Sequence, residues 1–210
     1  MKIVIFNGPP SSGKDTICKH LMDYGCHVMH YGCINSNSYF VHEKFAKPLK
    51  DGNRAIFDLT DEEFDLYDND PIAKNERCER FSGKSWRDVN IMLSENYFKP
   101  NFGKSIFGDL LSKRIQNKIN MNKILRWTKE PTFIISDGGF REELESVVAK
   151  FNPKDVYVIK LFREGCSFAG DSRNYIDTSG LGVNVYEITN NDLNTFKEHV
   201  ENLLYTIHRE

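Results

Sequence analysis

The chain has 210 residues, which is enough for one α/β domain with a modest insertion. Its 28 basic and 30 acidic side chains give a net charge of −2, so the overall balance provides no general attraction for duplex DNA. The five cysteines form no C-x-x-C pair, which argues against a zinc site or a disulfide framework and favours the reducing cytoplasm. No apolar run is long enough to span a bilayer, so we expect no membrane association.

The first predicted element is a buried strand, KIVIFNG, which leads directly into the segment GPPSSGKD. The pattern G-x-x-x-x-G-K between a strand and a helix is the context that a phosphate-binding loop requires. In such a loop the backbone N–H groups face phosphate oxygens, and the lysine reaches the β- and γ-phosphates of ATP. The predicted ATP-binding residues are Gly8, Ser11, Ser12, Gly13, Lys14, Asp15 and Thr16.

Asp15 departs from the usual pattern, because a serine or threonine hydroxyl normally binds magnesium at that position. Two arrangements stay open from sequence. Asp15 binds Mg²⁺ through a water molecule, or Thr16 supplies the hydroxyl. A helical pattern follows the loop at residues 16–23.

The next section, residues 45–129, reads as a mostly helical insertion rich in aromatic residues. Helical spacing or a first-turn proline marks FAKPLKDGNRAIFDL, DVNIMLSENYF and FGDLLSKRIQNKI. Residues 58–80, which are rich in acids, are expected to form a solvated helix pair or a loop. An insertion of this kind is where we expect substrate specificity to reside.

A second buried strand, PTFIISDGG, ends with Asp137 at the edge where open parallel sheets bind ligands. A carboxylate there can hold magnesium or its water, which makes Asp137 a candidate catalytic and metal-binding residue. A helix is predicted at residues 141–150, so Arg141 either faces the substrate or lies on the surface of that helix.

A third buried strand, DVYVIKLFR, precedes a loop rich in glycine and serine. Arg163 and Arg173 lie in this loop and could stabilise charge on a transferred phosphoryl group, and Asp171 is close enough in sequence to hold Arg173. The tail NNDLNTFKEHVENLLYTIH has apolar residues at helical spacing after an Asn/Asp cap, which predicts a docked final helix.

Four motifs in order, GKDT, FAKPLKD, SDGGF and ITNND, resemble the deoxynucleoside monophosphate kinases of tailed bacteriophages, within the adenylate-kinase-like P-loop kinases. The resemblance implies an α/β P-loop NTPase fold, with a parallel sheet flanked by helices, a helical insertion and a lid loop. It implies a single kinase domain over residues 1–210, with its core at 1–44 and 130–210, its insertion at 45–129 and its lid near 163–182.

The resemblance also implies an ATP- and Mg²⁺-dependent enzyme of the cytoplasm, of the host cytoplasm if the chain is phage-encoded. The acceptor would be a small nucleotide, and a homodimer stays open as an assembly. A monophosphate carries close to two negative charges, so its site should contain arginine or lysine, and a side-chain amide can read a base edge. The predicted substrate-binding residues are Lys47, Lys50, Arg87, Asn90, Lys104 and Arg141.

Other functions remain to be distinguished. The loop after the third strand also resembles that of phage P-loop kinases that phosphorylate 5-hydroxymethyluracil within DNA, where Asp137 would act as general base. The run from Lys113 to Lys129 holds six lysines and arginines and no acid, so it is either a DNA track or a solvated helix face. A GTPase is disfavoured because no Asn-Lys-x-Asp motif occurs, and a nucleotide-binding protein without catalysis stays open.

Overall fold

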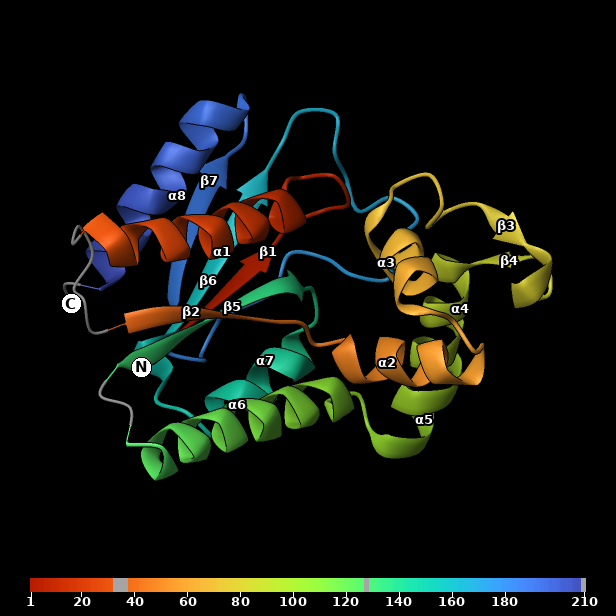
Figure 1. Ribbon diagram of the computed structural model, residues 1–210, viewed down its shortest axis with the longest axis horizontal. Coiled ribbons are helices and arrows are strands. Elements are labelled where there is room, and N and C mark those ends of the chain that lie inside the picture. Colours follow the sequence, from red (N-terminus) through yellow and green to blue (C-terminus); the bar gives the residue numbers. More distant parts are fainter. Residues whose placement is uncertain (32–37, 127–128, 209–210) are drawn as a thin grey trace. The chain divides into compact units, whose positions relative to one another are not determined.

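The computed structural model describes residues 1–31, 38–126 and 129–208 of the chain (Figure 1). Helices flank a five-stranded parallel sheet, so the predicted α/β class is confirmed, and the arrangement is compatible with a P-loop-like fold. Within the described ranges, no helix combines the length and the apolar character that crossing a membrane requires.

The sheet has the strand order β2-β5-β1-β6-β7, and each neighbouring pair is parallel. Because the strands are parallel, their carboxyl ends lie along one edge of the sheet. The chain adds β2 and β5 on one side of β1 and then β6 and β7 on the other, so the winding direction reverses at β1. The strands are β1 Lys2–Asn7, β2 Ser38–Glu43, β5 Glu130–Gly138, β6 Val156–Phe162 and β7 Asn184–Thr189.

The three strands predicted from apolar runs are the three central strands, β1, β5 and β6. Nearly all of their residues are buried, because helices cover both faces. The edge strands β2 and β7 were not predicted. Side chains of β7 alternate between half-buried or buried and exposed, so this strand lacks the continuous apolar run that marks the central ones.

Helices cover the two faces of the sheet in pairs (Figure 1). Helix α1, Lys14–Tyr31, lies beside α8, Leu193–Ile207, on one face. Helix α6, Ile106–Ile124, and α7, Arg141–Val148, lie on the other, and a 3₁₀ turn at Pro153–Asp155 leads into β6. The final helix is confirmed, with Asp192 as its N-cap, whereas α1 is longer than predicted at both ends.

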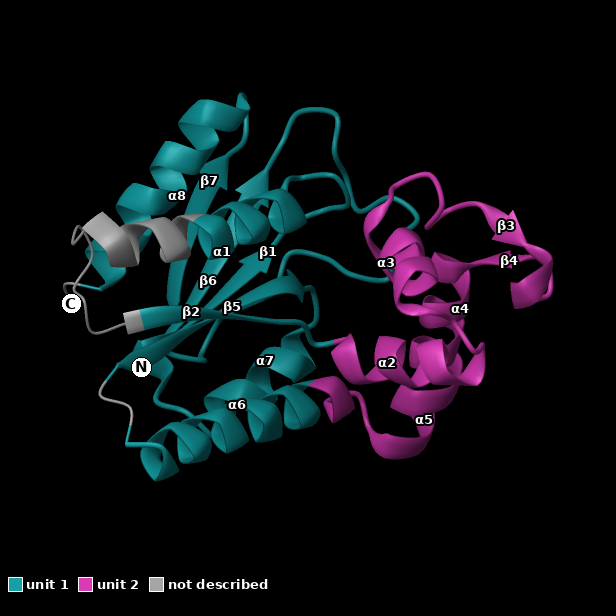
Figure 2. Ribbon diagram, in the orientation of Figure 1, with its two compact units in different colours: residues 1–45, 108–210 teal, residues 46–107 magenta. Residues whose placement is uncertain are grey.

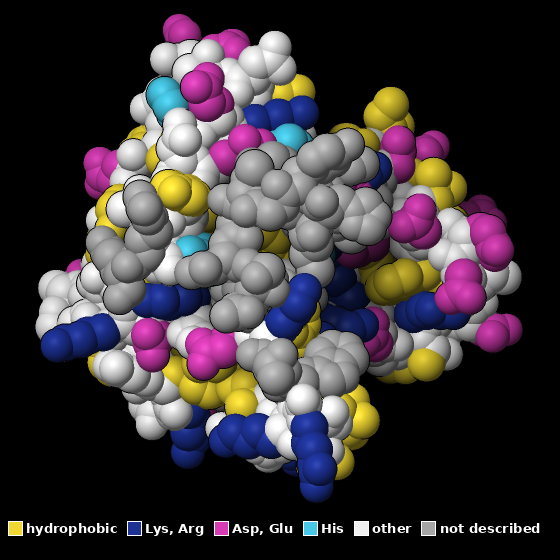
Figure 3. Space-filling view, turned by 60° about the vertical axis from the view of Figure 1, so that its left-hand side comes forward, with side chains coloured by type: hydrophobic (Ala, Val, Ile, Leu, Met, Phe, Trp, Pro, Cys, Tyr) yellow, Lys and Arg dark blue, Asp and Glu magenta, His cyan; other side chains and the backbone are white. Residues whose placement is uncertain are grey.

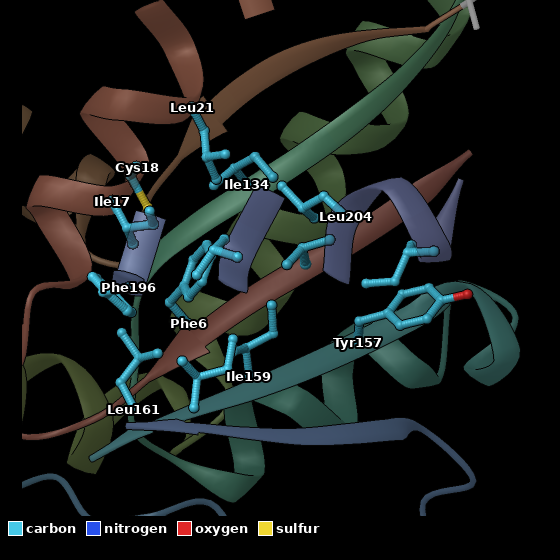
Figure 4. Close-up of a cluster of buried hydrophobic side chains, with 14 residues drawn as sticks. Phe6, Ile17, Cys18, Leu21, Ile134, Tyr157, Ile159, Leu161, Phe196 and Leu204 are labelled. Carbon is cyan, nitrogen blue, oxygen red and sulfur yellow. The ribbon is translucent and has the colours of Figure 1, made fainter. Parts of the chain in front are cut away.

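The core between the sheet and the first pair of helices is a continuous apolar cluster (Figure 4). Phe6 and Ile159 from the strands meet Ile17 and Leu21 from α1 and Phe196 from α8, all of them fully buried. Burial of each such side chain stabilises the fold by about 1.5–3 kcal/mol. The loop between β1 and α1 therefore joins two elements that are packed firmly against each other.

The chain divides into two compact units, Met1–Phe45 with Gly108–Glu210 and Ala46–Phe107 (Figure 2). The inserted unit is thus shorter than the 45–129 expected from sequence, because most of α6 belongs with the sheet. Leu111 and Ile115 of α6 are fully buried, and Gly108 lies against the backbone of Glu143 in α7. A side chain at Gly108 would collide there, so this glycine allows the two helices to approach closely.

The inserted unit is helical with a small two-stranded sheet. Its elements are α2 Lys47–Ile56, α3 Asp61–Asn69, β3 Arg77–Cys78, a 3₁₀ turn Glu79–Phe81, β4 Lys84–Ser85, α4 Trp86–Leu93, a π-helical turn Ser94–Phe98 and α5 Lys99–Phe102. Capping boxes start α3 and α4, and Pro48 lies in the first turn of α2 as predicted. Phe81 and Trp86 are the largest side chains of its separate apolar core.

Candidate functional site

The glycine loop joins β1 to α1 at the carboxyl edge of the sheet, and its two glycines are each required by a close approach. A Cβ atom on Gly8 would lie 2.7 Å from Ser12 Oγ and 2.8 Å from the Leu161 carbonyl oxygen. Gly13 has φ +103°, and its Cβ would lie 2.7 Å from Asn190 Nδ2. Only glycine fits at both positions without strain.

Lys14 is the first residue of α1 and is only 6% exposed. Its Nζ donates hydrogen bonds to the carbonyl oxygens of Gly8, at 2.6 Å, and Pro9, at 2.7 Å. Burial, together with the nearby charge of Arg173, lowers the pKa of Lys14 to about 8. The loop thus holds a buried cation in contact with its own backbone carbonyl groups.

Two buried asparagines that the sequence reading missed hold the loop and its surroundings. Asn190, at the end of β7, donates from Nδ2 to the carbonyl oxygen of Ser12 at 3.0 Å. Asn7, at the end of β1, donates to the carbonyl oxygens of Gly138 and Asn174 and accepts from the Ile176 N–H. Asn190 belongs to the motif ITNND, but the motif does not show which backbone group its amide binds, and asparagine is also common in turns.

Asp15 and Thr16 point to the exterior at the start of α1. The Asp15 side chain is 73% exposed, and its Oδ1 lies 3.8 Å from Nζ of Lys44, the residue that follows β2. Thr16 is also exposed. An acid in the first turn stabilises the helix, since it lies at the positive end of the helix dipole. The structure leaves both magnesium arrangements in place as predictions.

Asp137 lies near the end of β5, as the sequence predicted, and Gly138 pairs with Asn7 of β1. Its Oδ1 accepts a hydrogen bond of 2.7 Å from the backbone N–H of Phe45. This bond links the segment that follows β2 to the carboxyl end of β5. Its position at the carboxyl edge of the sheet keeps Asp137 a candidate magnesium ligand.

Arg173 reaches the same region from the loop after β6. Its guanidinium makes two hydrogen bonds to Asp171, at 2.9 and 2.8 Å, so the expected pairing with Asp171 is confirmed. Its aliphatic stem packs on Gly139, where a Cβ atom would lie 2.5 to 2.6 Å from Cβ, Cγ and Cδ of Arg173. The glycine therefore makes the room that the arginine occupies.

The loop after β6 is anchored at several points rather than free along its length. Arg163 donates to the carbonyl oxygen of Ser11, and Tyr175 stacks on Phe162 while its hydroxyl donates to the carbonyl oxygen of Leu161. Arg141 ion-pairs with Glu145 and Asp177 and donates to the carbonyl oxygen of Ser179. Arg141 therefore ties α7 to the loop, which favours a structural role for it over a substrate-binding one.

Lys47, Lys50 and Asn90 lie in the inserted unit, and each has a partner there. Lys50 Nζ lies 2.5 Å from Oδ1 of Asp68, and both side chains are largely buried. Lys47 pairs with Asp51, and Asn90 accepts from Asn53 while donating to the Trp86 carbonyl oxygen.

The two remaining cationic candidates of this unit differ in exposure. Arg87 is half-buried in α4, and Lys104 is exposed in the segment before α6. Their assignment to a substrate site stays a prediction.

The charged groups around the loop fit a bound polyphosphate and magnesium. Asp15, Asp137, Asp171 and Arg173 each act electrostatically on Lys14, so each lies within electrostatic range of its ammonium group. Carboxylate and hydroxyl oxygens are the ligands that Mg²⁺ prefers, and one or two carboxylates are enough when phosphates supply the rest. Among the described residues, no cluster of three or more Asp, Glu, His or Cys side chains suggests a site that would hold a metal ion alone.

Two cations of the basic run, residues 113–129, form ion pairs within the protein. Arg114 and Lys118 of α6 bind the carboxylate of Glu43, at 3.0 and 2.8 Å, and Glu43 is 2% exposed. Burial opposes ionisation of Glu43, but the hydrogen bonds from these two residues lower its pKa overall. Lys113, Lys123 and Arg126 are exposed, and residues 127–128 lie outside the described ranges. Figure 3 shows that lysine and arginine side chains gather in the lower part of that view.

No family model matches the sequence, and no curated protein matches it. The functional assignment accordingly rests on the residues and contacts described above.

Proposed function

We propose that the chain is a kinase that transfers the γ-phosphoryl group of ATP to a deoxynucleoside monophosphate. The observation that carries the proposal is the glycine loop at the carboxyl end of the central strand β1, with buried Lys14 at its end. A buried ammonium with a lowered pKa gains strongly from an anionic partner, because such a partner replaces the hydration that burial removed.

On the donor side, each residue has a role that follows from its charge. Lys14 would exchange its carbonyl contacts for oxygens of the β- and γ-phosphates. Arg163 and Arg173 would stabilise the charge that spreads over the transferred group. Magnesium, when bound with the nucleotide, would supply charge neutralisation, and Thr16 and Asp137 are the residues that would hold it or its water, since Asp15 already lies beside Lys44.

On the acceptor side, the phosphate of a monophosphate is already ionised, so no general base is needed and positioning supplies most of the rate. We assign that positioning to Lys47, Lys50, Arg87 and Lys104, with Asn90 facing the base. Since Lys50 already pairs with Asp68, an acceptor phosphate would have to compete with that carboxylate.

Phosphorylation of 5-hydroxymethyluracil in DNA is the alternative, and one observation weighs against it. Two cations of the basic run, Arg114 and Lys118, already pair with Glu43, so a DNA backbone would have to compete with that carboxylate for them. The alternative is therefore kept as an outcome of the test.

The test is label transfer from γ-labelled ATP, offered separately to each deoxynucleoside monophosphate and to DNA containing 5-hydroxymethyluracil. We expect label on a free nucleotide. A Lys14→Met variant prepared in parallel should lose the signal, which excludes a contaminating kinase. Label on the DNA alone would establish the alternative, and ATP binding without transfer to any acceptor would indicate a non-catalytic nucleotide-binding protein.

A further inference from the structure

Lys44 is a cation beside the glycine loop that no sequence pattern indicated. Its Nζ lies 3.8 Å from Oδ1 of Asp15, and its side chain is 18% exposed whereas that of Asp15 is 73% exposed. The lysine is thus the enclosed member of the pair. It reaches the first turn of α1 from the end of β2, so the contact joins two elements that are distant in sequence.

The backbone around Lys44 is fixed by bonds on both sides. Arg114 donates a 2.6 Å hydrogen bond to the carbonyl oxygen of Lys44, and the next N–H, that of Phe45, donates to Asp137. The preceding residue, Glu43, is buried and bound by two cations of α6. Residues 43–45 are therefore all held by hydrogen bonds or ion pairs, which fixes the backbone from which the Lys44 side chain extends.

The position of Asp15 creates an electrostatic conflict that Lys44 can resolve. An acid in the first turn of α1 weakens the positive end of the helix dipole, which is the part of the loop that would face phosphate. Asp15 also acts on Lys14 directly. A cation held next to this acid cancels its charge while leaving Lys14 available for a phosphate oxygen.

We propose that Lys44 is a further residue of the polyphosphate site, where it neutralises Asp15 so that the loop accepts a nucleoside triphosphate despite an acid at the hydroxyl position. The inference rests on the proposed function, because it presupposes that the loop binds ATP. Lys44 acts through Asp15 and is a positioning residue.

The test is the affinity for Mg·ATP, measured by calorimetry at low ionic strength for the wild type, Lys44→Met, Asp15→Asn and the double variant. Lys44→Met should weaken binding about tenfold, because it leaves Asp15 uncompensated beside the phosphates. Asp15→Asn should bind at least as tightly as the wild type, and the double variant should return to within about threefold of it. Lys19→Met, which removes an exposed lysine of the same helix, is the matched control and should change nothing.

Recovery of affinity in the double variant distinguishes neutralisation of Asp15 from a direct phosphate contact or a purely structural role of Lys44. A double variant as weak as Lys44→Met would mean that Lys44 contacts phosphate itself or only supports the fold, and either result overturns the proposal. Unchanged affinity in Lys44→Met also overturns it. If the wild type fails to bind ATP, the proposed function falls first and the inference falls with it, and this is visible before any variant is compared.

Discussion

The two units of the molecule hold their candidate residues in different ways. In the sheet unit, the glycine loop is fixed by partners far away in sequence, such as Asn190 on Ser12 and Arg163 on Ser11. In the inserted unit, the candidates pair with groups of nearby helices or of their own helix, as Lys50 does with Asp68 and Lys47 with Asp51.

This difference sets the free-energy cost of binding an anionic ligand in each unit. The loop has a shape set by the fold, so a polyphosphate would meet groups that are already in position, and binding would cost little ordering. Lys47 and Lys50 of the inserted unit already have carboxylate partners, so an anionic ligand would gain only the difference between the two pairings. We therefore expect substitutions in the first unit to affect binding and those in the second to affect stability first.

The largest effect is expected from adding one methyl group to the loop. Gly13→Ala should weaken ATP binding about 10³-fold, because alanine costs about 1–2 kcal/mol at a positive φ and its collision with Asn190 and the Phe196 ring costs about 1–3 kcal/mol more. Binding is measured by calorimetry and folding by circular dichroism.

The same change in the inserted unit is its control. Gly52→Ala adds a methyl group in the middle of α2, where no atom lies within 4 Å of it, and should stabilise the protein by about 0.5–1 kcal/mol. ATP affinity should be unchanged in Gly52→Ala. If Gly13→Ala also left ATP affinity unchanged, the loop would not be held as rigidly as its contacts indicate.

The next largest effect is expected from the enclosed ion pair of the inserted unit. Lys50→Met should lower the free energy of unfolding by about 2–4 kcal/mol, because it leaves the carboxylate of Asp68 enclosed without its cation. Urea unfolding followed by fluorescence in a Trp127→Phe background reports on this unit, since Trp86 lies in its core.

Its matched control is on the same helix. Lys47→Met breaks a pair in which both side chains are about half exposed, and the free energy of unfolding should change by less than about 0.5 kcal/mol. If the two lysines cost the same, burial is not what distinguishes them and the contrast between the pairs is wrong.

The smallest effect is a pH dependence of the loop. Lys14 has a pKa of about 8 in the folded chain, below its ordinary 10.5, and it must be charged to bind phosphate. ATP affinity should therefore be constant below pH 8 and fall about tenfold per pH unit above it, with proton uptake on binding. Because the pKa is depressed, folding itself is disfavoured by this lysine below pH 8, and that penalty is relieved as pH rises from 8 to 10.5.

Calorimetry from pH 7 to 9.5 in buffers of different ionisation enthalpy measures both the affinity and the proton uptake. A Lys14→Arg variant keeps its charge over this range and should lose the slope. The same slope in Lys14→Arg would assign the pH dependence to another group.

Local sequence patterns predicted the central strands β1, β5 and β6, the final helix, the glycine loop and the position of Asp137 near a strand end. These features depend on short-range signals, namely apolar runs, an N-cap and glycines at fixed spacing. The edge strands gave no such signal, since an exposed strand needs no continuous apolar run. The placement of most of α6 with the sheet depended on its contact with α7, which no local pattern encodes.

By itself the sequence determined which residue types the loop contains, since glycine spacing and a following lysine specify a phosphate-binding pattern. Only the tertiary structure decided which distant groups surround that loop. Lys44 and Asn190 reach it from the ends of β2 and β7, and Arg173 occupies the space that Gly139 leaves open. The physical reason is that a parallel sheet gathers strand ends from separate parts of the chain at one edge, and the sequence carries no record of that proximity.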